Sequence, residues 1–511
     1  MISLSKPSNS ARKQHLWKTI DLGHHSLRWA EKLYPQNNRN PDHSLQNSGG
    51  NTDHQPKINT ALSLERLSWC ELELLKSASR LGQSHLGRKL HFSEWEAVDQ
   101  LASSPFLGTL HRINKSDRGF WMQTPQGEST PSTLFSNWLN ESLTPEKTLG
   151  EAQPQTNHSL LWLSSSSYLP HLSSLIYRCF SELPYTHGAY LNHAVALLIG
   201  LSDPYKARLQ SGVWGVLDVG NSQASWQLIE VEQSHVPLHL NYKVLQSYGR
   251  SFVGERALRR SLINDHLLRG AYTWSEFNSQ LRQEWLDYVS LQADCLIKQA
   301  WPKAYLSSIE QQHIQSSVKI GQEERQVFDG FQQACFEAIM SWIKYSLKQT
   351  NMGPEALRGI YVTGKQSLAL MPLLRKAMRV VNVKVAPLGI EHIGAHRYID
   401  RVLYQEDQGY HIEDVSPYAL ILRDDYEGLT KEVFSEQTSV PCIYEVDLGE
   451  SQGELSLWLS NYGELEQKIA YLSRCTQKSR LQIVYETPQQ FDLNWLQSDD
   501  TSDIQPQWVK V

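Results

Sequence analysis

Three short segments of this chain share one plan, in which an apolar strand runs into a turn that contains a glycine. The segments are residues 19–26 (TIDLGHHS), 215–222 (GVLDVGNS) and 360–367 (IYVTGKQS). In the first two, an aspartate stands two residues before the glycine, at Asp21 and Asp218. One such motif is weak evidence, because Asp-x-Gly is common in ordinary turns. Three of them in this order and at this spacing constrain the fold much more strongly.

Turns of this kind suit the binding of a phosphorylated ligand. A glycine turn directs backbone N–H groups at a phosphate, and an aspartate at a strand end can hold Mg²⁺ through water. The third turn has no acid and suits a place beside an adenosine. The residues predicted to bind nucleotide are Asp21, Leu22, Gly23, His24, His25, Asp218, Gly220, Asn221, Ser222, Gly364 and Lys365.

Length and composition restrict the classes of protein that fit this chain. With 511 residues it is too long for one core and predicts two to four folding units. A formal net charge of −6 predicts no general attraction to nucleic acid or to an anionic membrane. Its six cysteines form no CxxC pair, and no apolar stretch approaches the length of a membrane span. We therefore expect a cytoplasmic protein with reduced thiols.

Periodicity divides the chain into a mixed α/β part and a β tail. Apolar spacing predicts helices over 191–201, 274–298, 326–348 and 368–378, and strands over 157–163, 212–231 and 359–363. From residue 414 onward, short alternating runs predict antiparallel strands at 433–440, 442–448, 454–459 and 480–485. Eight tryptophans lie in or beside apolar runs and are predicted to be core residues: Trp121, Trp138, Trp162, Trp214, Trp226, Trp285, Trp301 and Trp342.

The order of these features resembles that of the actin-like ATPase superfamily, and most closely its DnaK-type heat-shock chaperones. Residues 21–26 resemble the first phosphate loop of that family, 218–225 the second, and 362–367 the adenosine loop. Further family motifs fall at Asn192-His193, Gly254-Glu255 and Ile393-Gly394-Ala395. Residues 414–417 and 438–441 resemble segments of the family's peptide-binding β-sandwich. The resemblance covers nearly the whole chain, weakly at each residue but consistently in order.

This resemblance implies an α/β fold with two ribonuclease-H-like lobes, followed by an antiparallel β-sandwich. The implied organisation is a flexible leader (1–18), a nucleotide-binding domain (19–409), a linker (410–413) and a β substrate domain without a helical lid (414–511). ATP or ADP with Mg²⁺ is the implied cofactor, with Asp21 and Asp218 holding the metal through water. The implied partners are extended client peptides and a J-domain co-chaperone. The leader is similar to that of the HscA branch, which implies an iron–sulfur scaffold protein as client.

Several positions depart from the family pattern. Gln83, His193 and Gln223 stand where the family has its catalytic lysine, a glutamate and a threonine of the second loop. Phosphoryl transfer depends on positioning and on charge stabilisation. We therefore expect hydrolysis of ATP to be very slow or absent. In active relatives the linker is a run of leucines that docks on the nucleotide domain, and here the run contains Glu413. Because burying a charge is costly, we expect ATP-driven coupling between the domains to be impaired.

Two interpretations of function remain open from the sequence. The first is a chaperone-type protein with weakened nucleotide regulation, and the second is a pseudo-ATPase interaction scaffold, which the substituted catalytic positions favour. A small-molecule kinase is disfavoured because no catalytic base is evident. His24 and His25 have no carboxylate or cysteine at ligand spacing, so we interpret them as loop histidines rather than metal ligands. Lys365 suits a nucleotide contact and a solvated loop equally well.

Overall fold

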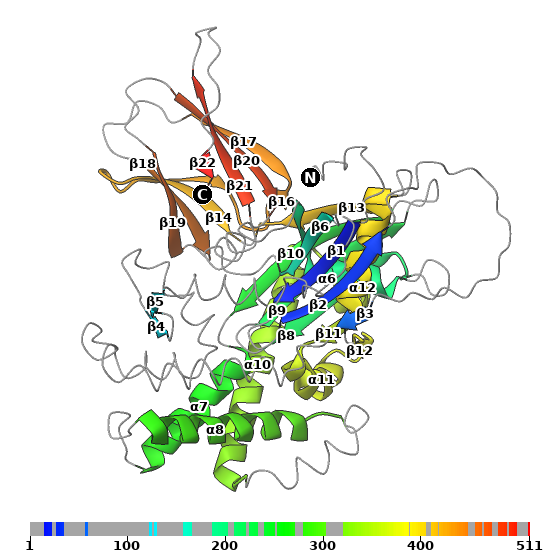
Figure 1. The fold of residues 1–511 in the computed structure, drawn as a ribbon, viewed down its shortest axis with the longest axis vertical. Helices are drawn as coiled ribbons and strands as arrows, with labels where there is room; N and C mark the ends of the chain where they lie inside the picture. Colours follow the sequence, from blue (N-terminus) through cyan, green and yellow to red (C-terminus); the bar gives the residue numbers. More distant parts are fainter. Residues whose placement is uncertain are drawn as a thin grey trace, which may run out of the picture.

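The computed structural model describes residues 15–22, 27–34, 57–59, 122–124, 127–129, 157–165, 187–202, 209–220, 224–233, 240–250, 253–270, 279–302, 320–387, 389–404, 410–416, 418–447, 455–461, 464–472, 479–487, 490–497 and 509–510. These residues form a mixed α/β structure with several sheets (Figure 1). None of the described helices combines the length and the apolar character needed to cross a lipid bilayer.

The first sheet has five strands in the order β3-β2-β1-β6-β7. Its strands are β1 (His15–Leu22), β2 (Leu27–Tyr34), β3 (Lys57–Asn59), β6 (Asn157–Ser164) and β7 (His187–Asn192). The first three strands form an antiparallel meander, and β6 and β7 continue the sheet parallel to β1. Ile20 and Leu161 on the inner strands are fully buried. A separate short hairpin joins β4 (Met122–Thr124) to β5 (Gly127–Ser129).

The second sheet repeats this arrangement. Its first five strands in chain order are β8 (Gly212–Val219), β9 (Ala224–Gln233), β10 (Leu240–Arg250), β11 (Leu357–Thr363) and β12 (Val383–Val385), in the spatial order β12-β11-β8-β9-β10. Here too the first three strands are antiparallel, and the fourth and fifth run parallel to the first. Counted in chain order, both sheets therefore read 3-2-1-4-5 with the same strand directions.

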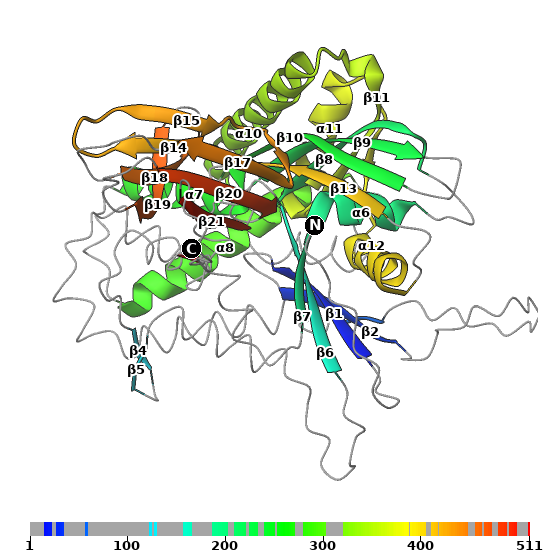
Figure 2. The same ribbon diagram turned by 90° about the horizontal axis from the view of Figure 1, so that it is seen from above.

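A helix follows the fifth strand of each sheet, and the two helices pack against each other between the sheets (Figure 2). They are α6 (His193–Leu201) and α12 (Ile390–Ile399). Their backbones approach closely: a Cβ on Gly394 would lie 1.8 Å from the carbonyl oxygen of Ala196, and one on Gly200 would lie 2.1 Å from that of Ile390. Only glycine fits at such a crossing. One hydrophobic cluster joins α6 and α12 to residues of both sheets, such as Trp17 and Trp214.

α10 (Gln322–Gln349) and α11 (Lys365–Ala377) cover the far face of the second sheet. α7 (Glu255–Gly270) and α8 (Ser279–Gln299) pack on these two helices and form the outer part of the helical layer. Trp226 of β9 is fully buried against α10 and donates a hydrogen bond to Ser346 Oγ at 2.9 Å. Of the tryptophans predicted to be core, Trp162, Trp214, Trp226 and Trp342 are buried. Trp301 is half-buried, Trp121 and Trp138 lie outside the described residues, and the side chain of Trp285 is not described.

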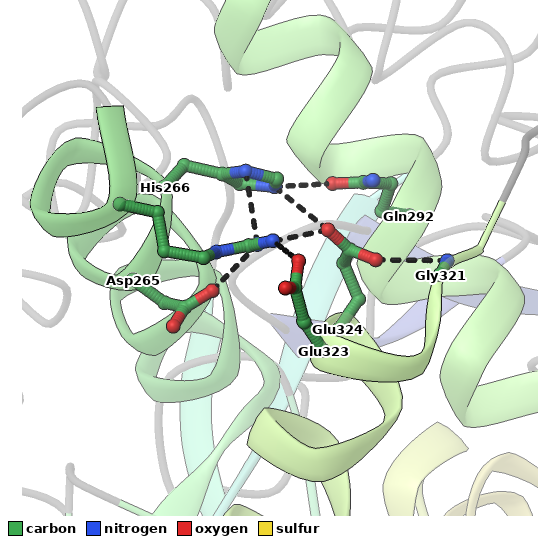
Figure 3. A network of polar contacts seen from close by, with 7 residues as sticks. Asp265, His266, Gln292, Gly321, Glu323 and Glu324 are labelled. Atoms are coloured by element: carbon green, nitrogen blue, oxygen red, sulfur yellow. Dashed lines mark hydrogen bonds and ion pairs between the residues drawn. The ribbon is translucent and has the colours of Figure 1, made fainter.

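A polar network fastens α7 to the start of α10 (Figure 3). The guanidinium of Arg269 lies 2.8 Å from Glu324 Oε1 and also contacts Glu323 and Asp265. Burial acts to raise the pKa of the Glu324 carboxyl, but hydrogen bonds from Arg269 and from backbone N–H groups outweigh it and lower that pKa. Glu324 Oε2 also accepts from the backbone N–H of Gly321 at 2.8 Å, which closes the first turn of α10.

Apart from β16 (Ser439–Val440), the described strands beyond residue 418 form two four-stranded antiparallel sheets, as the alternating pattern predicts. One contains β14 (Ala419–Asp424), β15 (Thr430–Phe434), β18 (Leu455–Asn461) and β19 (Glu464–Leu472). The other contains β17 (Cys442–Asp447), β20 (Ser479–Thr487), β21 (Gln490–Gln497) and β22 (Val509–Lys510). A single hydrophobic cluster that includes Leu457 and Ile483 lies between the two sheets.

The predicted strand 433–440 is wrong as a single element. The structure ends β15 at Phe434 and begins β16 (Ser439–Val440) after a turn. Gln437 adopts a positive φ of 62°, which no strand residue takes, and its side-chain amide is fixed by Ser247: Oε1 accepts from the Ser247 N–H at 2.8 Å, and Nε2 donates to the carbonyl at 2.9 Å. The contact of Gln437 with Ser247, which is distant in the sequence, therefore interrupts the predicted strand 433–440.

Residues 410–413, expected as the linker, belong to a strand of the second sheet. β13 (Tyr410–Val415) pairs in parallel with β10, so Glu413 does not keep this segment off the sheet. The expected loss of ATP-driven coupling stays a prediction. Its carboxylate stays partly exposed and lies 3.4 Å from Lys243 Nζ. Burial acts to raise the pKa of Glu413, but the hydrogen bond with His411 and the charge of Lys243 outweigh it and lower that pKa. The charge is thus accommodated without full desolvation.

Candidate functional site

Two of the three predicted turns lie in contact. Asp218 is near the end of β8, and Gly364 joins β11 to α11 with a positive φ of 84°. A Cβ on Gly364 would lie 2.4 Å from the carbonyl oxygen of Val219 and 2.6 Å from Asp218 Oδ1. The hydroxyl of Ser367 accepts from the N–H of Val219 at 3.0 Å and donates to the carbonyl of Thr363. The predicted strand-to-helix turn is confirmed, and it packs directly on the acidic strand end.

The second turn also reaches the helical layer. The carbonyl oxygen of Gly220 accepts from the N–H of Glu255, at the start of α7, at 3.2 Å. Glu255 is buried and its carboxylate lies 2.5 Å from Arg259 one turn later. β8 and β9 form the hairpin that the sequence predicts. Val219 and Gly220, at the end of β8, therefore lie against both Gly364 and the start of α7.

Asp21, the aspartate near the end of β1, lies close to the first turns of the two helices α6 and α12. It is 8% exposed, near the end of β1. Ligand-type atoms of Asp21, His193 and Glu391 lie within 4.8 Å of one another, and all three side chains are buried. His193 is the first residue of α6, and Glu391 is in the first turn of α12. Asp21 and Asp218 thus occupy equivalent positions in the two repeated sheets.

The start of α6 is fixed by a cap that also reaches the C-terminal part of the chain. Asn192 Oδ1 accepts from the N–H groups of Ala194 and Val195 at 2.9 and 3.3 Å, which satisfies the first turn of the helix. Its amide nitrogen donates to Asp414 Oδ2 at 2.9 Å. Asp414 is 6% exposed and belongs to β13. The residue before His193 is therefore bonded to β13, which precedes the C-terminal sheets in the chain.

Other polar contacts join the two sheets around this site. The hydroxyl of Tyr190 lies 3.3 Å from both Asp414 Oδ2 and the carbonyl oxygen of Ser164. Gln227 on β9 donates from Nε2 to Ser165 Oγ, directly after β6, at 3.0 Å. Thr19 Oγ1 lies 2.9 Å from His392 Nδ1, which ties β1 to α12. Side chains from both sheets and from β13 thus meet where the strands of the first sheet end.

Several predicted site residues fall outside this description. Gly23, His24, His25, Gln83, Asn221, Ser222 and Gln223 are not among the described residues. Leu22 and Lys365 belong to β1 and α11, but their side chains are not described. The structure adds Glu391, Asn192 and Asp414, which sequence reasoning did not assign to the site. Glu391 lies in the first turn of the helix equivalent to the one that begins with His193, a correspondence that only the folded structure shows.

Comparison with known proteins adds no family to these observations. No protein-family model matches the chain, and no curated protein matches it significantly.

Proposed function

We propose that this protein binds ATP or ADP between two lobes of an actin-like ATPase fold, as DnaK-type chaperones do, and that its C-terminal sheets bind extended peptide segments. The duplicated sheet carries the proposal. Two sheets of order 3-2-1-4-5, each followed by a helix that packs on its counterpart, match the paired ribonuclease-H-like lobes of that superfamily. No single motif in the sequence would support this fold as strongly.

The residues at the two strand ends fit a nucleotide with its metal. Asp21 and Asp218 supply carboxylates at equivalent points of the two sheets, where such groups hold Mg²⁺ directly or through water. The turn at Gly364 presents backbone close to Asp218, and it opens α11, whose N-terminus favours negative charge. These residues would hold the metal and position the phosphates and the adenosine.

Binding without appreciable hydrolysis is the expected activity. His193 stands at the family's glutamate position, beside Asp21. An imidazole does not supply the negative charge that a carboxylate brings to the positioning of water and metal. Each lost positioning group lowers the rate of a reaction of this kind by roughly 10²–10³-fold.

A bonded path supports coupling between the nucleotide site and the C-terminal sheets. It runs from His193 to the adjacent Asn192, and from the Asn192 amide to Asp414 on β13. The next residue of β13, Val415, pairs with Ser439 of β16. We propose that a peptide binds to the C-terminal sheets by adding a strand, using backbone hydrogen bonds at a sheet edge. β15 and β19 form the edges of one sheet among the described strands.

The alternative is a scaffold that has kept the fold and lost the nucleotide. The buried His193 favours it, because a histidine replaces an acid beside Asp21. A scaffold requires no nucleotide affinity, whereas the first proposal does. Peptide binding alone does not distinguish the scaffold from the nucleotide-binding protein, so the titration with nucleotide distinguishes them.

The proposal is tested by calorimetric titration with ATP and ADP in Mg²⁺, together with phosphate release. We expect binding with no more than trace turnover. Gly364→Ala should weaken binding at least about tenfold, or 1.4 kcal/mol, because its Cβ would displace Val219 or Asp218. Gly428→Ala is the matched control, since Gly428 also has a positive φ but nothing lies within 4 Å of its Cβ position.

Each outcome of this titration has one interpretation. No binding at millimolar nucleotide, in wild-type protein with a native circular dichroism spectrum, contradicts the proposal and supports the scaffold. Tight binding with rapid turnover contradicts the loss of hydrolysis. If nucleotide binds, anisotropy of a labelled extended apolar peptide, with and without ADP, tests the coupling through β13.

A further inference from the structure

We propose that Asp21, His193 and Glu391 form a binding site for one divalent transition-metal ion, which the chain holds without any nucleotide. Ligands of one tetrahedral Zn²⁺ ion lie about 2.0–2.2 Å from it and therefore about 3.3–3.6 Å from each other. The three ligand-type atoms here lie within 4.8 Å of one another. Side-chain movements of no more than about 1 Å would complete the coordination.

The charges of the cluster favour a cation. Asp21, His193 and Glu391 are 8%, 6% and 2% exposed, so two carboxylates lie close together away from bulk water. Buried like charges raise the free energy of the folded state unless a proton or a cation compensates them. The N-termini of α6 and α12 each contribute about half a positive charge, which favours anionic ligand side chains at this point. A divalent ion neutralises the pair.

The three ligands stand on rigid elements. Asp21 belongs to a central strand, paired with β2 on one side and β6 on the other. His193 follows the Asn192 cap, and Glu391 lies in the helix that crosses α6 through Gly200 and Gly394. The close helix crossing fixes the two helix starts relative to each other, so the ligand set is pre-organised for an ion.

The ligand types select the class of metal. Mg²⁺ and Ca²⁺ prefer sites made of oxygen ligands alone. An imidazole with two carboxylates suits Zn²⁺, Co²⁺, Fe²⁺ or Mn²⁺ better. This site is therefore distinct in ligand set from a Mg²⁺ ion held through water by Asp21 and Asp218, and it does not rest on nucleotide binding.

Metal titration of the full chain tests the site. Protein stripped with EDTA is titrated with Co²⁺, followed by its visible absorption, and with Zn²⁺ and Mg²⁺, followed by calorimetry. We expect one tight equivalent of Co²⁺ or Zn²⁺ per chain in the absence of nucleotide, with Mg²⁺ bound at least about 100-fold more weakly. Zn²⁺ should also raise the melting temperature, because a ligand that binds only the folded state stabilises it.

Variants locate the metal. Glu391→Gln keeps the shape of the side chain and removes one charged ligand, so it should lower Co²⁺ affinity by about 100-fold or more, since loss of even a supporting partner costs 10–100-fold. His411→Gln is the control: this histidine also lies near a carboxylate, at 3.2 Å from Glu413, but it is half exposed and far from the cluster in the chain. It should leave the affinity unchanged.

The proposal is overturned if wild-type protein binds no tight equivalent, if Mg²⁺ binds as well as Co²⁺, or if Glu391→Gln binds Co²⁺ like wild type. If Glu391→Gln fails to fold, two other measurements test the site. They are the number of Co²⁺ ions bound by the wild-type protein and the visible Co²⁺ spectrum of the His193→Gln variant. Glu391 is not part of the proposed nucleotide contacts. Loss of Co²⁺ with retained ADP binding therefore separates this site from the proposed function.

Discussion

Gly394→Ala should lower the free energy of unfolding by about 3 kcal/mol, near the upper end of the usual cost of overpacking. The added Cβ would lie 1.8 Å from the Ala196 carbonyl oxygen and 2.6 Å from the Gly200 nitrogen. Both contacts are with backbone, which cannot rotate away as a side chain can. The helices α6 and α12 must then separate, and the cluster that joins the two sheets loses its packing. Urea unfolding followed by circular dichroism measures the change.

Gly330→Ala is the control for this experiment. Gly330 lies in α10, and no atom lies within 4 Å of its Cβ position. Because alanine favours a helix over glycine by about 1 kcal/mol, this variant should be neutral or slightly more stable. If Gly394→Ala unfolds at the same urea concentration as wild type, the two helices do not cross at these glycines.

Acidification from pH 7 to pH 5 should destabilise the protein through His396. Burial in α12 lowers the pKa of His396 to about 3, with smaller lowering by the charges of Lys32 and His392, while a backbone hydrogen bond at Ala30 acts to raise it. The unfolded chain therefore binds this proton near pH 6.5 and the folded chain does not until about pH 3. Between these limits stability falls with decreasing pH, by about 2 kcal/mol between pH 7 and 5.

His396→Gln isolates this contribution. The variant cannot take up the proton, so its difference in stability from wild type should shrink by about 2 kcal/mol between pH 7 and 5. All other titratable groups are shared by the two proteins and cancel in the difference. Urea unfolding of both at the two pH values measures it. A difference that stays constant with pH would show that His396 protonates equally in the folded and unfolded states.

Local sequence signals predict the strand ends and turns well. The runs before Asp218 and Gly364 are short, apolar and bounded by residues that favour turns, and the structure has β8 and β11 there. The helix predicted at 191–201 is confirmed from His193 onward as α6, because Asn192, the last residue of β7, is a strong N-cap ahead of an apolar run. These signals are local, so the sequence carries them without reference to the rest of the fold.

Local sequence signals do not predict which residues come together in the site. Glu391 is about 370 positions from Asp21, and nothing in its helix distinguishes it from an exposed acid until α12 packs against β1. The same holds for Glu413, whose charge argues against a docked strand when considered alone. Lys243, on the neighbouring strand, reverses that argument. Contacts between residues distant in the sequence determine the environments of Glu391 and Glu413, and the periodicity of the sequence does not predict such contacts.

The most direct test of the central claim, that nucleotide binds at the strand ends of the duplicated sheets, is hydrogen–deuterium exchange with and without Mg²⁺-ADP. We expect slower exchange in peptides that cover residues 19–26, 215–222 and 360–367, all three together. Peptides from β18 and β19 provide the internal comparison and should be protected less. Unchanged exchange in all three segments at saturating nucleotide, or protection confined to other segments, would contradict the account.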